Sequence, residues 1–286
     1  GPISIHARDD KSGTYDTFES LVLDPAGVAL SPDAARYESN ALLSDTVAND
    51  PNAIGFGGFA FLRNAKALAV GSDCGIVSSP STFAVKTEEY PLSRRLFLYT
   101  DAEMGAEARG LLDFALSDAA QGAVLDVGFI DQGIDSLDFD AQGRRIATAH
   151  LQPQVDFDAR LMRQALETLI SATRLSTTFR FETGDTALDG KGRQDMRRLA
   201  RRLAQPDMAA REVMVVGFTD SVGSFARNRA LAEARARTVV ESLRAEDPAM
   251  AQRSIEPVAY AELMPVACNT TPAGRSRNRR VEVWVR

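Results

Sequence analysis

Three observations predict a protein of two domains, of the α/β and α+β classes. The 286 residues are enough for two cores, and a composition of 44% hydrophobic and 25% charged residues is typical of globular proteins. Charge is unevenly shared, because residues 1–130 hold 18 acidic and 9 basic side chains while residues 131–286 hold 21 and 24. In the C-terminal part, helix-like and strand-like patterns alternate, which indicates an α/β sandwich.

Apolar spacing predicts the elements of this C-terminal part. Phe179 and Phe181 alternate with polar residues as in a half-buried strand, and residues 188–203 carry apolar side chains at helical spacing. The run 213–216 is entirely apolar and predicts a buried strand. Valines alternate with other residues over 281–286 and predict a closing strand. An additional helix is expected within 156–173.

A strand-to-helix turn carries the most informative polar residues. The buried run leads into the turn 217–223, which contains Asp220, and a helix is expected over 224–244. Arg235 lies on the apolar stripe of this helix, and helical side chains lean toward the N-terminus, so its guanidinium is expected to point back toward Asp220. Asn228 lies about two turns earlier on the same face. The three polar side chains are expected to converge on one spot.

These residues resemble the OmpA-like peptidoglycan-binding domain, whose pattern runs Gly-His-Thr-Asp-Ser, Asn, Leu-Ser, Arg-Ala and Asn-Arg-Arg-Val. The matching positions, within a likeness spanning 177–286, are Gly217 to Ser221, Asn228, Leu231-Ala232, Arg235-Ala236 and Asn278 to Val281. The resemblance implies that Asp220 and Arg235 bind the diaminopimelate side chain of the peptidoglycan stem peptide. A carboxylate accepts hydrogen bonds from an ammonium, while a guanidinium pairs with a carboxylate in two parallel bonds. Thr219, Asn228 and Arg279 are further candidates for peptidoglycan binding.

The match has departures and an alternative interpretation. Phe218 stands where the family has His and Ala232 where it has Ser, so no polar contact is expected from either. The alternative is that Asp220 and Arg235 form a salt bridge inside the domain that only holds the helix to the turn. For Arg279, a structural role is the first expectation and ligand contact the second.

A second motif lies near the N-terminus, at residues 8–14. Ser12 is a natural N-cap for a helix that starts after it, and Gly13 lets backbone approach an anion closely. The N–H groups of the helix start, a hydroxyl and the charge of Arg8 together predict an oxyanion site. The alternative is a capped helix with an ordinary Arg-Asp pair.

Residues 3–130 resemble the phosphate-binding receptors of ABC transporters (PstS-like proteins). The segments that carry the resemblance are Arg8 to Thr14, Val47 to Phe56, Lys66-Ala67, Tyr90 to Thr100 and Phe114 to Phe129. The resemblance implies that Arg8, Asp10, Ser12, Gly13 and Thr14 bind phosphate. Asp10 would accept a hydrogen bond from a protonated phosphate oxygen, which distinguishes hydrogen phosphate from sulfate.

The family has two lobes, and this chain starts where the family crosses from lobe one to lobe two. A partial lobe of the type II periplasmic-binding-protein fold is therefore expected, followed by an OmpA-like βαβαββ sandwich. Gly1-Pro2 resembles the remnant of a removed tag, so a trimmed chain is expected. Residues 97–130 would then return to an incomplete lobe and pack elsewhere, with a second copy of the chain as one partner.

These observations divide the chain into a receptor-like domain (3–130), a connector (131–155) and a wall-binding domain (156–286). The connector is expected to hold one hairpin, with strands at 136–139 and 146–150. Cys74 and Cys268 fall in different domains of this division. Two buried free thiols, or pairing with a cysteine in a missing part of the chain, are both left open.

The sequence favours a binding protein and several other classes are not indicated. His6 and His150 have no partner at a catalytic or metal-ligand spacing, so no enzyme, cofactor or metal is expected. Neither half is basic enough to indicate nucleic acid, and no apolar run is long enough to span a membrane. The prediction is a periplasmic phosphate- or oxyanion-binding protein anchored non-covalently to the cell wall of a Gram-negative bacterium. The alternative is a structural or signalling envelope protein whose receptor-like domain binds a protein.

Overall fold

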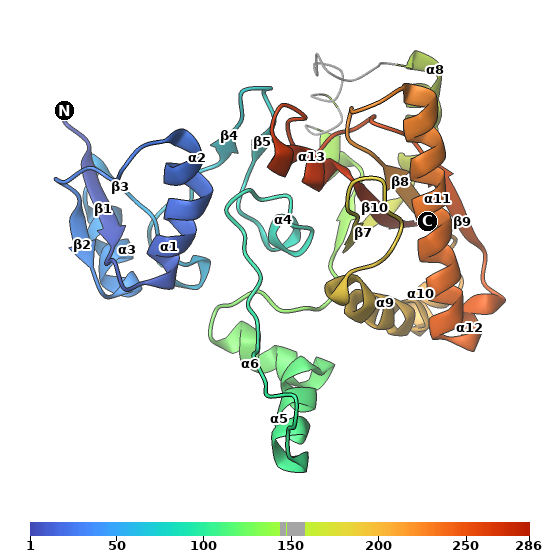
Figure 1. Cartoon of the computed structure of the whole chain (residues 1–286), viewed down its shortest axis with the longest axis horizontal. Coiled ribbons are helices and arrows are strands. Elements are labelled where there is room, and N and C mark those ends of the chain that lie inside the picture. Colours follow the sequence, from blue (N-terminus) through green and yellow to red (C-terminus); the bar gives the residue numbers. More distant parts are fainter. Residues whose placement is uncertain (144–146, 148–157) are drawn as a thin grey trace. The chain divides into compact units, whose positions relative to one another are not determined.

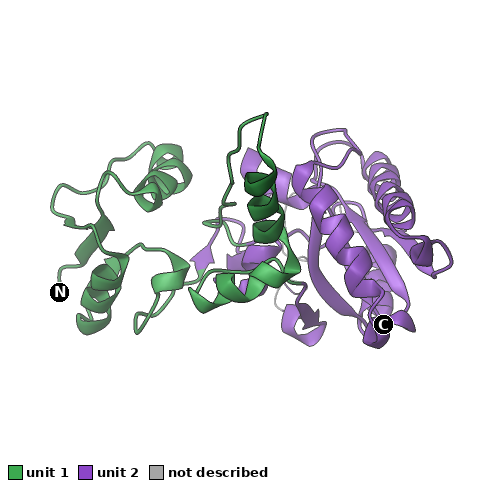
Figure 2. Ribbon diagram, turned by 90° about the horizontal axis from the view of Figure 1, so that it is seen from below, with its two compact units in different colours: residues 1–69, 90–133 green, residues 70–89, 134–286 purple. Residues whose placement is uncertain are grey.

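The computed structural model describes residues 1–143, 147 and 158–286, and these form two compact units. Unit 1 consists of residues 1–69 and 90–133, and unit 2 of residues 70–89 and 134–286, as coloured in Figure 2. The division differs from the predicted domains in two respects. The predicted connector is not a separate unit, because residues 131–133 belong to unit 1 and residues 134–143 to unit 2. Residues 70–89, expected within the receptor-like domain, belong to unit 2.

Unit 1 is an α/β unit around a small parallel sheet. Its strands are β1 (Ser4–Arg8), β2 (Ala35–Tyr37) and β3 (Ala53–Gly55), in the order β2-β1-β3. Its helical elements are α1 (Gly13–Phe18), the π-helical η1 (Glu19–Leu23), α2 (Asp24–Ala26), α3 (Asn40–Asn49), the 3-10 turn η2 (Phe59–Phe61), α5 (Ala106–Leu116), η3 (Asp118–Ala120) and α6 (Gln121–Asp126). The parallel strands and intervening helices agree with the predicted partial α/β lobe.

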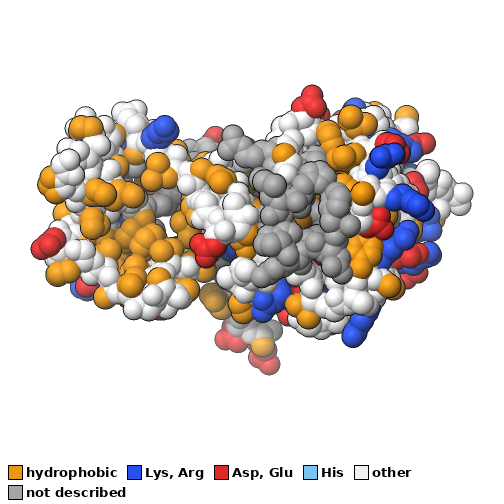
Figure 3. Space-filling view, turned by 90° about the horizontal axis from the view of Figure 1, so that it is seen from above, with side chains coloured by type: hydrophobic (Ala, Val, Ile, Leu, Met, Phe, Trp, Pro, Cys, Tyr) orange, Lys and Arg blue, Asp and Glu red, His pale blue; other side chains and the backbone are white. Residues whose placement is uncertain are grey.

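Unit 1 leaves many large apolar side chains in solvent. Leu96 is 70% exposed and Tyr99 is 92% exposed, and α5 contains no buried residue. Figure 3 shows apolar side chains gathered over the surface of the N-terminal part of the chain. Exposed apolar area of this kind marks a surface that another layer of protein normally covers. The described part of unit 1 is therefore a sheet and its helices without a full second layer.

Unit 2 is a sheet with helices on both faces, and most of its elements are labelled in Figure 1. Its strands are β4 (Val70–Gly71), β5 (Val77–Ser78), β6 (Ser136–Asp138), β7 (Thr173–Arg180), β8 (Val213–Phe218), β9 (Ile255–Ala259) and β10 (Arg280–Val285). Its helices are α4 (Thr82–Lys86), the 3-10 turn η4 (Asp140–Gln142), α8 (Ala159–Leu169), α9 (Gly190–Leu203), α10 (Pro206–Ala209), α11 (Phe225–Glu246), α12 (Pro248–Ala251) and α13 (Pro272–Asn278).

The main sheet has the order β6-β7-β10-β8-β9, so the C-terminal strand β10 lies at its centre. β10 runs antiparallel to both β7 and β8, whereas β8 and β9 are parallel. On one face, α9 and α11 bury the alternating valines of β10, and on the other face α8 packs against Trp284. The predicted βαβαββ order and the additional helix are both present. Because α8 covers the second face, β10 is buried on both sides.

The two cysteines correct an expectation from the sequence. Cys74, in the turn of the β4–β5 hairpin, forms a disulfide with Cys268, at a separation of 194 residues. Neither of the two expectations, free thiols or pairing with a cysteine in a missing part of the chain, is correct. The reason is the fold, because residues 70–89 belong to the same unit as Cys268 and the two cysteines are therefore neighbours.

The predicted hairpin of the connector is only partly described. Its first strand is β6, which pairs antiparallel with β7 and thereby extends the main sheet. The predicted second strand, over 146–150, lies outside the described residues apart from position 147. Within the described ranges, none of the helices combines the length and apolar character that crossing a membrane requires.

Candidate functional site

The turn after β8 holds Asp220 in a nearly buried position. Asp220 is 7% exposed. The backbone amide of the preceding residue, Thr219, donates to the carbonyl of Ala261 at 2.8 Å. The Oδ1 atom of Asp220 accepts from the amide of Val222 at 3.1 Å, which closes a tight turn around the carboxylate. Its Oδ2 atom accepts from Arg279 Nη1 at 2.9 Å. The carboxylate is thus fixed on both oxygens, and each oxygen retains capacity for a further bond.

Arg235 lies on the buried face of α11 and is 0% exposed. Its Nε donates to the carbonyl of Asp185 at 2.9 Å and its Nη2 to the carbonyl of Glu182 at 2.8 Å. The guanidinium lies over the ring of Phe181, with Cζ 5.1 Å from the ring centroid. Its Nη1 is buried and has no hydrogen-bond partner among the described residues. This nitrogen offers two unused donors to an anion.

The electrostatics of the site show that its charges are close together. The pKa of Arg235 is lowered to about 10, mainly by burial and next by the positive charge of Arg279. The negative charges of Asp220 and Asp185 raise this pKa and offset part of the effect. The guanidinium therefore stays protonated at neutral pH although its charge is costly to bury. The pKa of the exposed Asp185 is lowered, because its carboxylate accepts from the amides of Ala187 and Thr186.

Asn228 supports the site through two hydrogen bonds from its amide group. Its Nδ2 donates to the backbone carbonyl of Asp220 at 3.2 Å and to Glu262 Oε2 at 3.0 Å. Asn228 therefore fixes the main chain of the turn rather than the carboxylate. The Oγ1 of Thr219 is buried without a hydrogen-bond partner in the described part of the chain.

The structure brings the sequence-predicted residues together in an arrangement that differs from the simplest expectation. The described structure has an ion pair between Asp220 and Arg279, and none between Asp220 and Arg235. Arg279 also donates to the carbonyl of Phe181 at 3.1 Å. It is thus the nearest cation to the carboxylate, although the sequence indicated it only as a second-rank candidate.

Two contributions to the site were missed from the sequence. The loop around Glu182 and Asp185 supplies the carbonyls that orient Arg235, and backbone acceptors leave no signal in side-chain identity. Glu262, which is 2% exposed, holds Asn228 from a loop that carries no recognisable pattern. A single buried carboxylate in an irregular loop gives no periodic signal, so pattern analysis does not find it.

The N-terminal motif forms the predicted capped helix. Ser12 Oγ accepts from the amide of Thr14 at 3.2 Å, and Gly13 begins α1. Arg8 is 8% exposed and donates to the carbonyls of Tyr37 and Glu38, at 3.0 and 2.7 Å. The guanidinium is thus already engaged with backbone oxygens.

Two further arginines lie at this loop. Arg36 pairs with the exposed Asp10 at 3.1 Å and donates to the carbonyl of Arg8 at 2.9 Å. Arg94, which follows the Tyr-Pro segment, donates to the carbonyl of Gly13 at 2.7 Å. Arg8 also pairs with Asp9 at 3.7 Å, as the alternative interpretation expected. The loop therefore brings three arginines and two acidic residues together, and an anion would have to replace internal contacts.

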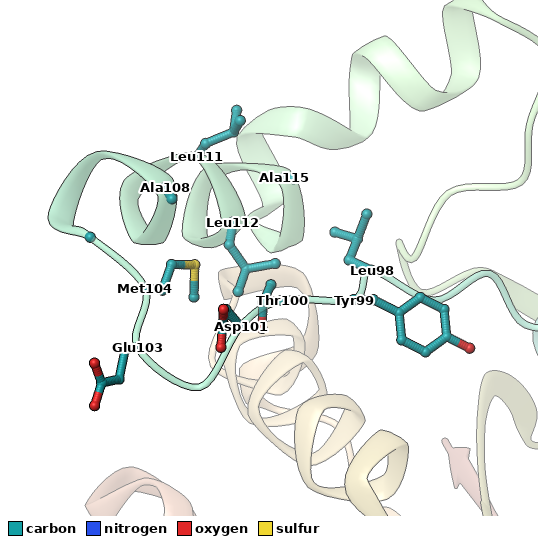
Figure 4. A pocket seen from close by; sticks show the side chains of 11 residues that line it. Leu98, Tyr99, Thr100, Asp101, Glu103, Met104, Ala108, Leu111, Leu112 and Ala115 are labelled. Atoms are coloured by element: carbon teal, nitrogen blue, oxygen red, sulfur yellow. The ribbon is translucent and has the colours of Figure 1, made fainter.

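An open pocket of about 610 Å³ in unit 1 has different chemistry. It lies between residues 98–105 and α5, and the side chains of Leu112 and Met104 lie between these two segments in Figure 4. Its charged lining residues are Asp101 and Glu103, and no lysine or arginine contributes to it. Two carboxylates repel an oxyanion, so this pocket is not a phosphate site.

The fold and the polar cluster of the C-terminal part are similar to those expected of an OmpA-like domain. The model of the OmpA family matches residues 180–279, a range that contains Asp220, Asn228, Arg235 and Arg279. Among similar proteins, the peptidoglycan-binding protein ArfA of Mycobacterium bovis is 38% identical over 91 residues, which are 32% of this chain and 26% of that protein.

The N-terminal part is similar to phosphate-binding proteins. Protein SphX of Synechocystis sp. is 32% identical over 136 residues, which are 45% of this chain and 40% of that protein. The phosphate-binding protein PstS of Bacillus subtilis is 31% identical over 144 residues, which are 50% of this chain and 46% of that protein. The chain thus spans less than half the length of these two relatives.

Proposed function

We propose that the C-terminal unit binds the diaminopimelate end of the peptidoglycan stem peptide, and so anchors an oxyanion-binding receptor to the cell wall. The free end of diaminopimelate carries an ammonium and a carboxylate on one carbon. Asp220 offers acceptors to the ammonium, and Nη1 of Arg235 offers donors to the carboxylate. The observation that carries the proposal is this unused, buried guanidinium nitrogen beside a fixed carboxylate.

The energetics favour a ligand at this position. A buried donor without a partner costs roughly 1–3 kcal/mol, and a ligand carboxylate would recover that cost as binding energy. The name of the mycobacterial relative, a peptidoglycan-binding protein, supports the same assignment. Retention at the wall places the protein in the periplasm, where non-covalent binding raises the local concentration of whatever the N-terminal part carries.

Retention on purified sacculi tests the wall-binding site. We expect Asp220→Ala and Arg235→Ala each to reduce the retained fraction of the full chain by roughly tenfold or more, since a charge-assisted pair contributes about 1.5–3 kcal/mol. Arg237→Ala is the matched control, because Arg237 lies on the same helix, pairs with Glu233 and is largely exposed. Equal retention of wild type and both site variants would remove the site assignment.

The chemistry of the cross-linking residue tests the ligand. Lysine-type peptidoglycan carries an ammonium at the corresponding position and lacks the neighbouring carboxylate. If Arg235 binds that carboxylate, the wild type is retained well on diaminopimelate-type walls and poorly on lysine-type walls. Arg235→Ala should then be retained equally on the two walls. Equal retention on the two walls would show that the stem-peptide assignment is wrong.

For the N-terminal part, we propose binding of phosphate or a similar oxyanion at residues 8–14. Its support is the similarity to SphX and PstS together with the cations around the capped start of α1. The role is binding rather than catalysis. An exposed acidic acceptor, Asp10, favours an anion that still carries a proton, and hydrogen phosphate does so at neutral pH whereas sulfate does not.

Calorimetric titration of the chain with phosphate, with sulfate as the control, tests this second proposal. We expect heat with phosphate only, and we expect Asp10→Asn to reduce the preference over sulfate. Absence of heat at millimolar phosphate would remove the receptor proposal for this chain. That result would favour the alternative of an envelope protein whose N-terminal part binds another protein through its exposed apolar surface.

A further inference from the structure

Residues 70–89 lie within the receptor-like part of the sequence but fold as part of unit 2. They form the β4–β5 hairpin, helix α4 and a short tail ending in Thr87-Glu88-Glu89. Phe83 and Thr87 of this segment are buried. We call residues 70–89 the brace, because its contacts reach the peptidoglycan site from two sides.

The first side is the disulfide. Cys74 of the brace is bonded to Cys268, and the next residue, Asn269, holds the turn that carries Asp220. Asn269 Oδ1 accepts from the amide of Ser221 at 3.3 Å and from Asn278 Nδ2 at 2.9 Å. The disulfide-bonded Cys268 is therefore adjacent in sequence to Asn269, and the side chain of Asn269 contacts Ser221, the residue after Asp220.

The second side is the C-terminal end of β7. Glu88 of the brace pairs with Arg180 at 3.5 Å, and the carbonyl of Thr87 accepts from Arg180 Nη2 at 2.5 Å. Arg180 is the last residue of β7 and directly precedes the two carbonyls that orient the cations of the site. These are the carbonyl of Phe181, which accepts from Arg279, and the carbonyl of Glu182, which accepts from Arg235.

A third contact joins the brace to the centre of the sheet. Glu89 pairs at 2.5 Å with Arg174, which is 1% exposed, and Arg174 pairs at 3.2 Å with the fully buried Glu282 of β10. The ring of Phe83 lies under the same guanidinium, 5.4 Å from Cζ. A carboxylate of the brace thus completes a charge network inside the wall-binding domain, where an unpaired charge is costly.

We propose that the brace is a positioning element of the peptidoglycan site, and this rests on the proposed function of that site. Through Cys74 it restrains the turn after Asp220, and through Glu88 it restrains the loop whose carbonyls orient Arg279 and Arg235. Wall binding by the C-terminal domain then depends on twenty residues that the sequence assigns to the receptor-like part. Neither Cys74 nor Glu88 touches the ligand in this arrangement.

The test uses the full chain with two changes in the brace, Glu88→Gln and the double variant Cys74→Ala with Cys268→Ala. Glu233→Gln, which breaks an exposed pair on α11, is the matched control. Two readouts are compared: retention on sacculi, and amide hydrogen exchange at 180–185 and 219–222. We expect retention to fall roughly threefold to tenfold for both brace variants. The amide exchange rates in the two loops should rise by more than the decrease in the global unfolding free energy can explain.

The outcomes separate this inference from the proposed function. If Asp220→Ala abolishes retention while both brace variants match the control in retention and exchange, the positioning role is wrong and the site stands. If exchange rises only as much as global stability falls, the brace is merely structural and the inference is likewise overturned. If Asp220→Ala binds as well as wild type, the site assignment fails. Faster exchange confined to the two loops would then show that the brace orders these loops without serving a peptidoglycan site, which overturns the inference.

Discussion

Gly217 sets the distance between the strand that carries Asp220 and the helix that carries Arg235. It lies in the buried strand β8, three residues before Asp220, and packs against Ala232 of α11, three residues before Arg235. A Cβ at Gly217 would lie 2.1 Å from the carbonyl oxygen of Ala232 and 2.8 Å from its carbonyl carbon. Both atoms belong to the backbone, so no side-chain rotation relieves the contact.

Gly217→Ala is therefore expected to separate β8 from α11. Moving the contact from 2.1 Å to the 3.4 Å at which ordinary contacts begin requires a shift of about 1.3 Å. Overpacking of a rigid core typically costs about 1–3 kcal/mol, and a smaller unfolded-state entropy offsets less than about 1 kcal/mol of this. Because the added Cβ clashes with a backbone atom, we expect the unfolding free energy to fall by an amount near the upper end of this range, about 2–3 kcal/mol. Retention on sacculi should fall too, since Arg235 moves with α11.

Urea unfolding followed by tryptophan fluorescence measures this loss. The chain has one tryptophan, Trp284, which lies in β10 of the same sheet, so its signal reports unit 2. Gly190→Ala is the control, because an added Cβ there meets only the flexible end of Arg193 at 3.9 Å. We expect it to be neutral or slightly stabilising. If the unfolding free energy of Gly217→Ala falls by less than about 0.5 kcal/mol and its retention on sacculi is unchanged, the close approach of β8 and α11 does not determine the geometry of the site.

Two other predictions concern buried charge. Glu282→Gln should lower the unfolding free energy by about 3–5 kcal/mol, measured by circular dichroism in urea, because Arg174 and Arg280 would lose their shared buried partner; a loss comparable to that of the exposed Glu233→Gln would contradict it. For Arg235, the folded pKa of about 10 lies below the ordinary 12.5, so the folded state releases this proton first as pH rises. The unfolding free energy of wild type relative to Arg235→Met should therefore increase by about 1 kcal/mol between about pH 9 and pH 11; a constant difference would show that the burial cost of this charge is small.

The sequence predicted the C-terminal fold well because its signals are local. The apolar run 213–216 is β8, and the helix expected over 224–244 is α11, for which Ser224 is the N-cap. The alternation in 281–286 correctly identified β10, but not that Glu282 and Trp284 are fully buried. Period-two alternation reports which residues share a face, and only the packing of α8 on the second face decides that both faces are covered.

The spatial grouping of the candidate residues was predictable from the sequence, and their pairing was less so. Helix geometry correctly directed Arg235 toward the turn, where its pKa responds to the charge of Asp220. Helix geometry could not predict that Arg279 is the cation that pairs with Asp220, because Arg279 lies in a segment 59 positions after Asp220 in the chain. The Cys74–Cys268 bond was unpredictable for the same reason, since it depends on residues 70–89 joining the C-terminal unit.

Under the proposed function, the contacts of the site predict which half of a zwitterionic ligand contributes more to binding. Both oxygens of Asp220 already accept a hydrogen bond, one from Val222 and one from Arg279, so an ammonium adds to a carboxylate that is already stabilised. Nη1 of Arg235, by contrast, is buried with its hydrogen-bonding capacity unused by the described residues. Because an unmet buried donor is costlier than a partly used acceptor, the ligand carboxylate should be the main anchor. Under the proposed function, we therefore expect discrimination between diaminopimelate and lysine to arise from the guanidinium, and Asp220 mainly to set the orientation of the ligand.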